Sequence, residues 1–251
     1  TPDKLTPRIQ QTAKLLWGVY VLISLIETIL LMLGGMNIFD SLCHTFGTMA
    51  TGGFSTKNTS VAHFDSAYID YVIVLFMFIA GANFSLHYYG LRGKFSSYWK
   101  SEEFRFYLGI TAFFTLFLTI DNLFSAVPNF LDSLQYSFFQ VVSITTTTGY
   151  ATADYEKWSS ASQFILMFLM FIGGSAGSTG GSVKVLRVMI FFKLGKTELK
   201  RLVHPKAIIP VRVDGNVVST NVIVNVLGFM FLYLAILVFA TIIMNVVGLD
   251  L

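Results

Sequence analysis

Two short segments of this chain combine threonine, glycine and an aromatic residue in a pattern suited to holding a cation. Residues 50–56 read Ala-Thr-Gly-Gly-Phe-Ser-Thr, and residues 145–152 read Thr-Thr-Thr-Thr-Gly-Tyr-Ala-Thr. Main-chain carbonyl oxygens can replace the hydration shell of an alkali cation, and glycine permits the dihedral angles that aim them. Threonine adds a hydroxyl acceptor. We expect such oxygens from a set that we name the filter residues: Ala50, Thr51, Gly52, Gly53, Phe54, Thr146, Thr147, Thr148, Gly149 and Tyr150.

A third segment, residues 173–181, places five glycines in nine positions of an otherwise apolar helix. Glycine costs a helix interior roughly 1 kcal/mol relative to alanine, so this density predicts local unwinding. A flexible loop here would block ions below the filter. The alternative is close helix packing, because glycine recurs at four-residue spacing. The gating hypothesis covers Gly173, Gly174, Ser175, Ala176, Gly177, Ser178, Thr179, Gly180 and Gly181, which we name the glycine loop.

Enzymatic interpretations of the glycine loop are weaker. Residues 173–177 formally match the G-x-S-x-G nucleophile motif, but that motif needs a strand before it and an acid, then a histidine, after it. Here an apolar helix precedes it, and the order of acid and histidine is reversed. An intramembrane serine protease is the alternative function, with Ser175 or Ser178 as nucleophile and His87 as base. The single cysteine, Cys43, excludes an intrachain disulfide and a multi-cysteine metal site.

Composition indicates a membrane protein with several spans. Hydrophobic residues make up 54% of the chain, charged residues only 12%, and the mean hydropathy is +0.67, whereas soluble domains carry about 25% charged residues. About 20 apolar residues cross a bilayer. Residues 39–50 and 131–146 are too short to cross, and we expect each to be a half-helix leading into one loop. The predicted spans are residues 14–34, 67–89, 104–124, 160–194 and 217–247.

Basic residues are distributed unevenly around these spans. Only Lys57 and Lys157 lie in the segments that carry the loops. The positive-inside rule therefore puts the N-terminus and the basic connections in the cytoplasm. The clusters flank apolar spans and form no known nucleic-acid-binding motif, so no nucleic-acid partner is expected. The fifteen basic residues outside the loop segments are Lys4, Arg8, Lys14, Arg92, Lys94, Lys100, Arg105, Lys184, Arg187, Lys193, Lys196, Lys200, Arg201, Lys206 and Arg212.

Acidic residues follow the opposite distribution and gather near the loops. An acidic mouth would concentrate cations. Asp40 and Asp132 are also placed to be helix N-caps. Glu27 is different, because it lies inside the first span, where a charge costs about 2.5–3.5 kcal/mol; it is expected to have a polar partner or a role. The acidic residues near the loops are Asp40, Asp65, Asp70, Asp121, Asp132, Asp154 and Glu156.

The chain contains an internal repeat of span, half-helix, loop and span. Three matches occur in the same order, at offsets of 92, 96 and 93: residues 40–42 with 132–134, 53–56 with 149–152, and 78–81 with 171–174. Pore filters built from such loops use four of them, and this chain supplies two. The others must come from other subunits or from a longer polypeptide. The predicted parts are residues 1–95, residues 96–195, a basic cytoplasmic linker at 196–216, and the first span of a truncated further repeat at 217–251.

In combination and in this order, five motifs make the chain resemble the Trk/Ktr/HKT superfamily of potassium transporters, and specifically the bacterial Trk-type membrane subunits. The resemblance covers essentially the whole chain. The motifs are the Pro-Arg-Ile lead-in at 7–9, the loops at 50–56 and 145–152, Ala-Gly-Ala-Asn-Phe at 80–84, and the glycine-rich run with its following Ser-Val-Lys at 173–184.

The resemblance implies an all-α membrane protein with four fused repeats arranged pseudo-fourfold around one pore. This chain would be the second and third repeats and the first helix of the fourth. Gly53 and Gly149 would be filter glycines, which favours potassium over sodium, and the glycine loop would be an intramembrane gate. The resemblance further implies potassium uptake without catalysis or a cofactor, location in the bacterial inner membrane, a homodimer, and a cytosolic nucleotide-binding regulatory ring as partner.

Overall fold

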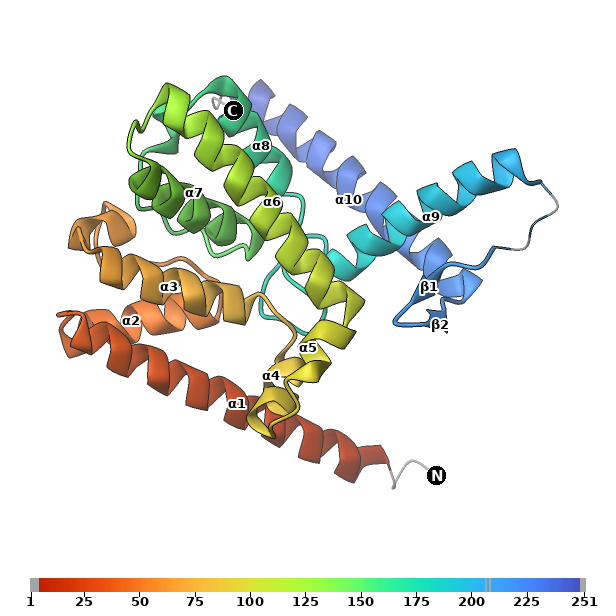
Figure 1. Cartoon of the computed structure of the whole chain (residues 1–251), viewed down its shortest axis with the longest axis horizontal. Coiled ribbons are helices and arrows are strands. Elements are labelled where there is room, and N and C mark those ends of the chain that lie inside the picture. The colour runs from red at the N-terminus through yellow and green to blue at the C-terminus, as the bar shows by residue number, and fades with distance from the viewer. Residues whose placement is uncertain (1–4, 206, 208, 249–251) are drawn as a thin grey trace. The chain divides into compact units, whose positions relative to one another are not determined.

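The structure is a computed structural model that describes residues 5–205, 207 and 209–248. It is helical almost throughout (Figure 1) and divides into two compact units, one ending at Val185 and the other beginning at Leu186. Lys4 and Lys206, two of the basic residues in the charge pattern, lie outside the described residues. The first unit contains α1 (Leu5–Leu33), α2 (Ile38–Met49), α3 (Ala67–Ala80), α4 (Phe84–Leu91), α5 (Ser96–Lys100), α6 (Glu102–Ser125), α7 (Phe130–Thr145) and α8 (Ser160–Leu169).

Three helices are long and apolar enough to cross a membrane, namely Gln10–Leu33 within α1, Glu102–Ser125 and Thr220–Val246. They confirm the predicted spans at 14–34, 104–124 and 217–247. The half-helices predicted at 39–50 and 131–146 are α2 and α7, each within one residue of its expected bounds. The prediction of an all-α membrane protein is therefore confirmed for the described residues, with one short hairpin added.

The second predicted span, residues 67–89, is wrong as a continuous helix. Its helix α3 ends at Ala80, and α4 begins at Phe84 after a bend of 105°. Asn83 caps α4, because its side-chain oxygen accepts a hydrogen bond from the Ser85 amide at 2.9 Å. A side-chain acceptor just before a helix satisfies an otherwise unpaired amide, which fixes the new start.

The fourth predicted span, residues 160–194, is interrupted as expected. Helix α8 ends at Leu169 and α9 begins at Val185, so the non-helical stretch is longer than the glycine loop itself. The alternative of a continuous helix with a glycine packing face is wrong, because none of the nine residues is helical.

The two half-helices begin in the same way. Asn37 caps α2 and Asn129 caps α7, and the side-chain nitrogen of each asparagine also donates to an aspartate three residues later, at 2.8 and 2.9 Å. The expectation that Asp40 and Asp132 are N-caps is therefore wrong: they lie in the first turn, where their charge suits the helix dipole. Helix α2 has 12 residues and α7 has 16. The four extra residues amount to about one helical turn.

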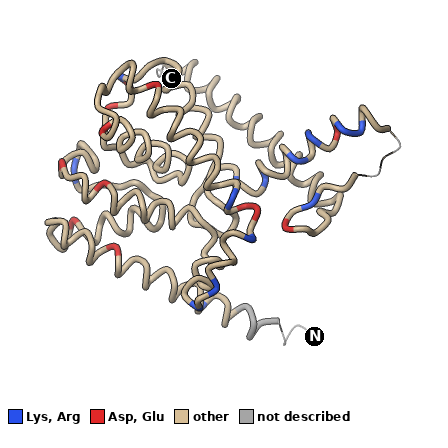
Figure 2. Tube along the Cα trace, in the orientation of Figure 1, with Lys and Arg blue, Asp and Glu red and all other residues tan. Residues whose placement is uncertain are grey.

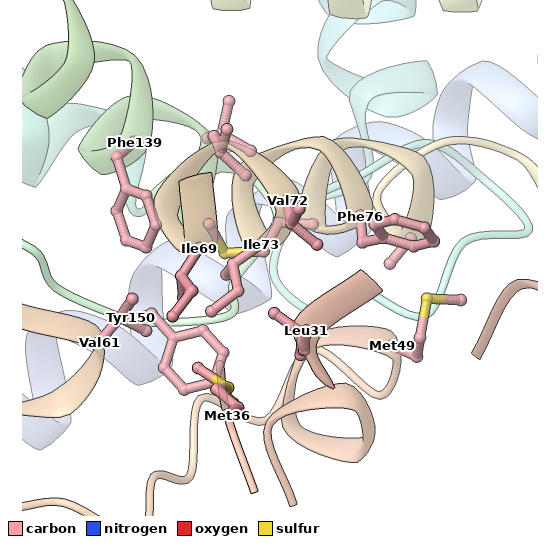
Figure 3. Close-up of a cluster of buried hydrophobic side chains, with 14 of the residues drawn as sticks. Leu31, Met36, Met49, Val61, Ile69, Val72, Ile73, Phe76, Phe139 and Tyr150 are labelled. Atoms are coloured by element: carbon pink, nitrogen blue, oxygen red, sulfur yellow. The ribbon is translucent and has the colours of Figure 1, made fainter. Parts of the chain in front are cut away.

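The core of the first unit lies where α1, α2, α3 and α7 meet (Figure 3). Leu31, Met49 and Ile73 are fully buried there, and Tyr150 from the second loop lies among them. A hydrogen bond of 3.0 Å between the Thr28 and Thr45 hydroxyls fixes α1 against α2. Because loop residues share this core with the spans, the position of the second loop is set by apolar burial.

Charged residues separate along the helices of the first unit (Figure 2). The basic residues between Arg92 and Arg105 lie where α4, α5 and the start of α6 meet, and the acidic residues lie mainly toward the opposite helix ends. Lys57 and Lys157 pair with acidic residues, Asp40 and Asp154, at 3.2 and 3.0 Å.

The second unit contains a short hairpin in the segment predicted to be a basic linker, and the first residue of the following predicted span, Val217, is part of it. Strand β1 (Arg212–Val213) pairs antiparallel with β2 (Asn216–Val217), and Asp214 and Gly215 between them have φ values of 48° and 79°. An Asp-Gly pair with positive φ at both positions is the signature of a two-residue turn. The unit also contains α9 (Val185–Val203), which begins at the boundary, and α10 (Thr220–Val246).

Gly81 at the end of α3 offers a test of the bend. A methyl group there would lie 2.5 Å from the Tyr107 hydroxyl and 2.6 Å from Thr146 Cγ2, both of them buried. We expect Gly81→Ala to lower the stability of the complete protein by about 1–3 kcal/mol through overpacking, measured by thermal unfolding in detergent. Gly109→Ala is the matched control, because Gly109 is exposed in α6 with nothing within 4 Å of the new methyl. Equal melting temperatures for the two variants would contradict this account of the bend.

Candidate ion-conduction site

The main chain turns at the end of each half-helix through the same pair of hydrogen bonds. In the first repeat the amides of Gly52 and Gly53 both donate to the Gly47 carbonyl, at 2.8 and 3.2 Å. In the second repeat Ser143 is the acceptor, at 2.9 and 3.2 Å, for the two residues that lie 96 positions further along. The two loops therefore share the same backbone hydrogen-bonding pattern. The extra turn of α7 lies N-terminal to the second loop and does not change its geometry.

Left-handed backbone conformations alternate in both loops. The φ angle is 52° at Thr51 and 65° at Gly53, and it is 62° at Thr147 and 87° at Gly149. Positive φ is strained for threonine and allowed for glycine. Because the same unusual angles recur at matched positions, they are a feature of the repeat and not of one loop.

The carbonyl groups at the centre of each filter loop are unpaired among the described residues, whereas those of Ala50, Phe54 and Tyr150 accept hydrogen bonds. No described residue donates a hydrogen bond to the main-chain oxygens of the central loop positions, whereas the amides beside them are satisfied by Gly47 and Ser143. Lipid cannot satisfy such oxygens, so at membrane depth they must face water or a cation. The unpaired oxygens belong to Thr51, Gly52, Gly53, Thr147, Thr148 and Gly149.

The two loops touch each other directly. A methyl group built on Gly53 would lie 1.9 Å from the Thr148 carbonyl oxygen, so only glycine permits this approach. The buried Tyr150 hydroxyl lies 3.0 Å from the Phe54 carbonyl and 3.2 Å from that of His44. The ring of the second loop therefore supports the main chain of the first.

A polar network joins helix α2 to the C-terminal end of the first loop. The Asp40 carboxylate accepts a hydrogen bond of 2.6 Å from the Thr56 hydroxyl and pairs with Lys57 at 3.2 Å. The Thr56 hydrogen bond and then the Lys57 ammonium lower the pKa of Asp40 below its ordinary value. His44 lies between helix and loop, with Nδ1 at 2.7 Å from the Asp40 carbonyl and Nε2 at 3.0 Å from Ser55 Oγ.

The glycine loop lies against the second filter loop. The Gly181 amide donates to Thr147 Oγ1 at 2.7 Å, and a methyl group on Gly180 would lie 2.9 Å from the Thr146 carbonyl oxygen. Two of the predicted filter residues thus contact the predicted gate. The sequence places these segments about thirty positions apart, and the fold brings them together.

The glycine loop is also tied to the bend between α3 and α4. The Ser175 amide donates to the Gly81 carbonyl at 2.8 Å, and the Phe84 amide donates to the Gly177 carbonyl at 3.1 Å. The Thr179 hydroxyl donates to the Ala80 carbonyl at 3.2 Å. Each break in a span therefore satisfies main-chain groups that the other break leaves unpaired, as irregular backbone within a membrane requires.

The glycines of this loop are needed for close approach. A methyl group on Gly173 would lie 2.0 Å from the Gly181 carbonyl oxygen, and one on Gly174 would lie 2.8 Å from that of Gly81. Gly177 has a φ of 76°, a left-handed angle that strains other residues.

The serine protease alternative receives no support. Nδ1 of His87 lies 2.8 Å from the Tyr98 hydroxyl and Nε2 lies 2.8 Å from the Ile79 carbonyl oxygen, so neither ring nitrogen pairs with a serine. Ser175 Oγ is buried without a hydrogen-bond partner among the described residues, and Ser178 Oγ lies 3.3 Å from Lys184 Nζ. Within the described residues no group of three or more His, Cys, Asp or Glu side chains could hold a metal.

Two acids are buried in helices α1 and α6. Glu27 in α1 is 0% exposed, and its carboxyl oxygens make no hydrogen bond of standard geometry among the described residues, although the Thr48 side chain of α2 is a polar neighbour of this carboxyl group. Glu103 in α6 was not singled out, yet one of its oxygens accepts a hydrogen bond of 2.5 Å from the Ala176 amide in the glycine loop. Only a contact between distant segments reveals this role.

Repeated units of span, half-helix and loop, with unpaired carbonyls in two loops that touch each other, define a membrane protein of the pore-loop class. A family model described as "TrkH: Cation transport protein" matches residues 2–250. The chain belongs to this family, which confirms the resemblance seen in its motifs.

Individual relatives support the same family assignment. The Trk system potassium uptake protein TrkH of Escherichia coli (strain K12) is 38% identical over 253 residues, covering 99% of this chain and 52% of that protein. TrkG of the same strain is 34% identical over 249 residues, covering 99% and 51%. The crystal structure of the potassium transporter TrkH from Vibrio parahaemolyticus matches with a TM-score of 0.93 at 36% identity, covering 97% of this chain and 53% of that one. The chain therefore spans about half the length of these relatives.

The contact between the loops can be tested through Tyr150. We expect Tyr150→Phe to destabilise the complete protein by about 1 kcal/mol, because the Phe54 carbonyl loses the hydrogen bond from the buried Tyr150 hydroxyl while the ring still fills the core. Thermal unfolding in detergent would measure the loss. Tyr89→Phe is the control, since the Tyr89 side chain is 44% exposed. A melting temperature unchanged in Tyr150→Phe would argue against a supporting role for this hydroxyl.

Proposed function

We propose that this chain forms half of a pore for potassium uptake across the bacterial inner membrane, with the ten filter residues forming its two ion-binding loops and the six unpaired main-chain oxygens among them coordinating the ion. The observation that carries the proposal is the set of unpaired main-chain oxygens in two matched loops. Such oxygens can replace the hydration shell of potassium. The printed names of the relatives, Trk system potassium uptake proteins, support the same ion.

The proposed pore needs further loops. Filters of this kind use four loops around one axis, and two are present here, so this chain would be the second and third of four repeats and the first span of the fourth. The divisions at residues 1–95, 96–195, 196–216 and 217–251 remain a prediction of that plan. Glycine at both Gly53 and Gly149 favours potassium over sodium.

Electrostatics favour a cation at the site without a fixed charge inside it. Helices α2 and α7 both end at a filter loop, and the C-terminal end of a helix carries a partial negative charge. The other acidic residues predicted near the loops would form an acidic outer mouth, since Asp40 is buried and its charge is balanced by Lys57. This orientation puts the N-terminus and the basic segments in the cytoplasm, in keeping with the positive-inside rule.

The complete protein is proposed to act as a homodimer that docks a cytosolic nucleotide-binding ring, with the basic linker at 196–216 among the surfaces available to it. No catalysis and no cofactor belong to this proposal, because potassium is the transported ion. The glycine loop is the proposed gate. Its contacts with Thr146 and Thr147 support a position immediately below the filter.

The filter assignment predicts a change in selectivity. We expect Gly149→Ser to reduce discrimination of potassium over sodium by about tenfold, a loss of ~1.4 kcal/mol in differential coordination, measured as relative ion flux in vesicles containing the complete protein. A side chain fits, since nothing lies within 4 Å of the new Cβ, but the φ of 87° strains the loop.

Gly35→Ser is the matched control for that experiment. Gly35 has a φ of 95° with nothing within 4 Å, so the strain is comparable, but it lies in the turn after α1 and outside the filter. Selectivity should stay unchanged there. An equal loss in both variants, or no loss at Gly149, would count against the filter assignment.

The gate assignment predicts higher flux when the loop is shortened. We expect deletion of residues 175–179 to raise potassium flux several-fold, because it removes the contacts with Gly81 and Ala80 that hold the loop in place. Ion selectivity should not change, since the filter loops are intact. Unchanged or lower flux, in protein that is folded and expressed normally, would contradict the gate.

A further inference from the structure

The middle of the glycine loop contacts a carboxylate that the proposed filter and gate do not use. The Ala176 amide donates to Glu103 Oε1 at 2.5 Å, across 73 positions of sequence. Glu103 lies in the first turn of α6 and is only 7% exposed. A hydrogen bond to an ionised acceptor is roughly twice as strong as one between neutral groups.

An acid in the first turn of a helix has an ordinary explanation, because negative charge there suits the helix dipole. Glu102 already satisfies that role from the same turn and is more exposed. Burying a second carboxylate beside it is costly unless hydrogen bonds compensate. The bond from Ala176 supplies such compensation, and it links α6 to the loop rather than to its own helix.

The remaining contacts of the loop surround this one. Neutral carbonyls of Ala80 and Gly81 accept hydrogen bonds from one flank. On the other flank Lys184 Nζ donates to the carbonyl oxygen of Gly180 and lies 3.3 Å from Ser178 Oγ. The loop is thus held by an acid at its middle and by a base near its end.

We propose that Glu103 is a positioning residue that latches the glycine loop in the closed state, and that opening requires the bond from the Ala176 amide to break. This inference rests on the proposed gating function of the loop. Glu103 acts through the main chain of the loop, since one of its carboxylate oxygens accepts the hydrogen bond from the Ala176 amide.

The surroundings of Glu103 connect the latch to the segment before α6. Ser101 caps the helix by accepting from the Phe104 amide at 3.3 Å, and the Phe104 ring packs on Tyr98 of α5 with centroids 5.1 Å apart. The Tyr98 hydroxyl in turn meets His87 of α4 at 2.8 Å. Movement of the α4–α5 connection would therefore shift the first turn of α6 and the carboxylate it carries.

The test is Glu103→Gln in the complete protein, which keeps the shape and an acceptor oxygen but removes the charge. Ser175→Cys serves as reporter, with Cys43 and any other cysteine replaced, because Ser175 is buried and its Oγ has no hydrogen-bond partner among the described residues. We expect the rate of thiol modification at position 175 to rise about tenfold, and potassium flux to rise with it at unchanged selectivity. A merely structural role would lower the melting temperature without exposing this thiol.

Glu102→Gln is the matched control, since it removes the same charge from the same helical turn; its thiol rate and flux should equal those of the parent. Glu103→Asp provides a second variant, because it keeps the charge but shortens the side chain by one methylene. We expect it to raise the rate of thiol modification less than Glu103→Gln does. Parent-level thiol rate and flux in a folded Glu103 variant would overturn the latch. A raised thiol rate in a protein that carries no potassium, parent included, would support the latch and reject the proposed transport function instead.

Discussion

The constraint on which this structure depends is that main-chain polar groups within a membrane must find partners. Helices satisfy it internally, and lipid offers no alternative. Two loops of this chain are exceptions. Their amides donate to the Gly47 and Ser143 carbonyls, but the carbonyls at the centre of each loop accept no hydrogen bond from the described residues. The short half-helices, the paired breaks in two spans and the buried Tyr150 are all consequences of holding those carbonyls in place.

The two repeats reach the same loop geometry with different side chains. In the first repeat Gly47 leaves room for the Tyr150 hydroxyl, since a methyl group there would lie 2.2 Å from it. In the second repeat Ser143 occupies the equivalent position, and its hydroxyl donates to the Tyr150 carbonyl at 2.6 Å. One repeat provides space for the ring and the other anchors its main chain. The repeats are therefore complementary, and exchanging residues between them would not preserve the site.

Local features of the fold were predictable from sequence, and contacts between distant segments were not. Apolar length identified three of the five predicted spans, and glycine density identified the break after α8, because each depends on residues within one window. The bend at Gly81 depends on Tyr107 and Thr146, which the local pattern does not contain. The asparagine caps and the Asp-Gly turn of the hairpin were local signals that could have been found.

The same distinction between local features and long-range contacts applies to the candidate site. The filter and glycine loops were visible as composition, but their mutual contacts, and the link from Glu103 to Ala176, arise only when α6 and α8 pack beside α7. Two acids of the first unit support these loops: Asp40 holds Thr56 and Lys57 beside the first filter loop, and Glu103 accepts a hydrogen bond from the glycine loop. Neutral oxygens that bind a cation moderately allow it to leave as well as to enter, whereas a charge among them would hold it. Under the proposed transport function, acids at the supports rather than in the path would fix the position of the loops without trapping the ion.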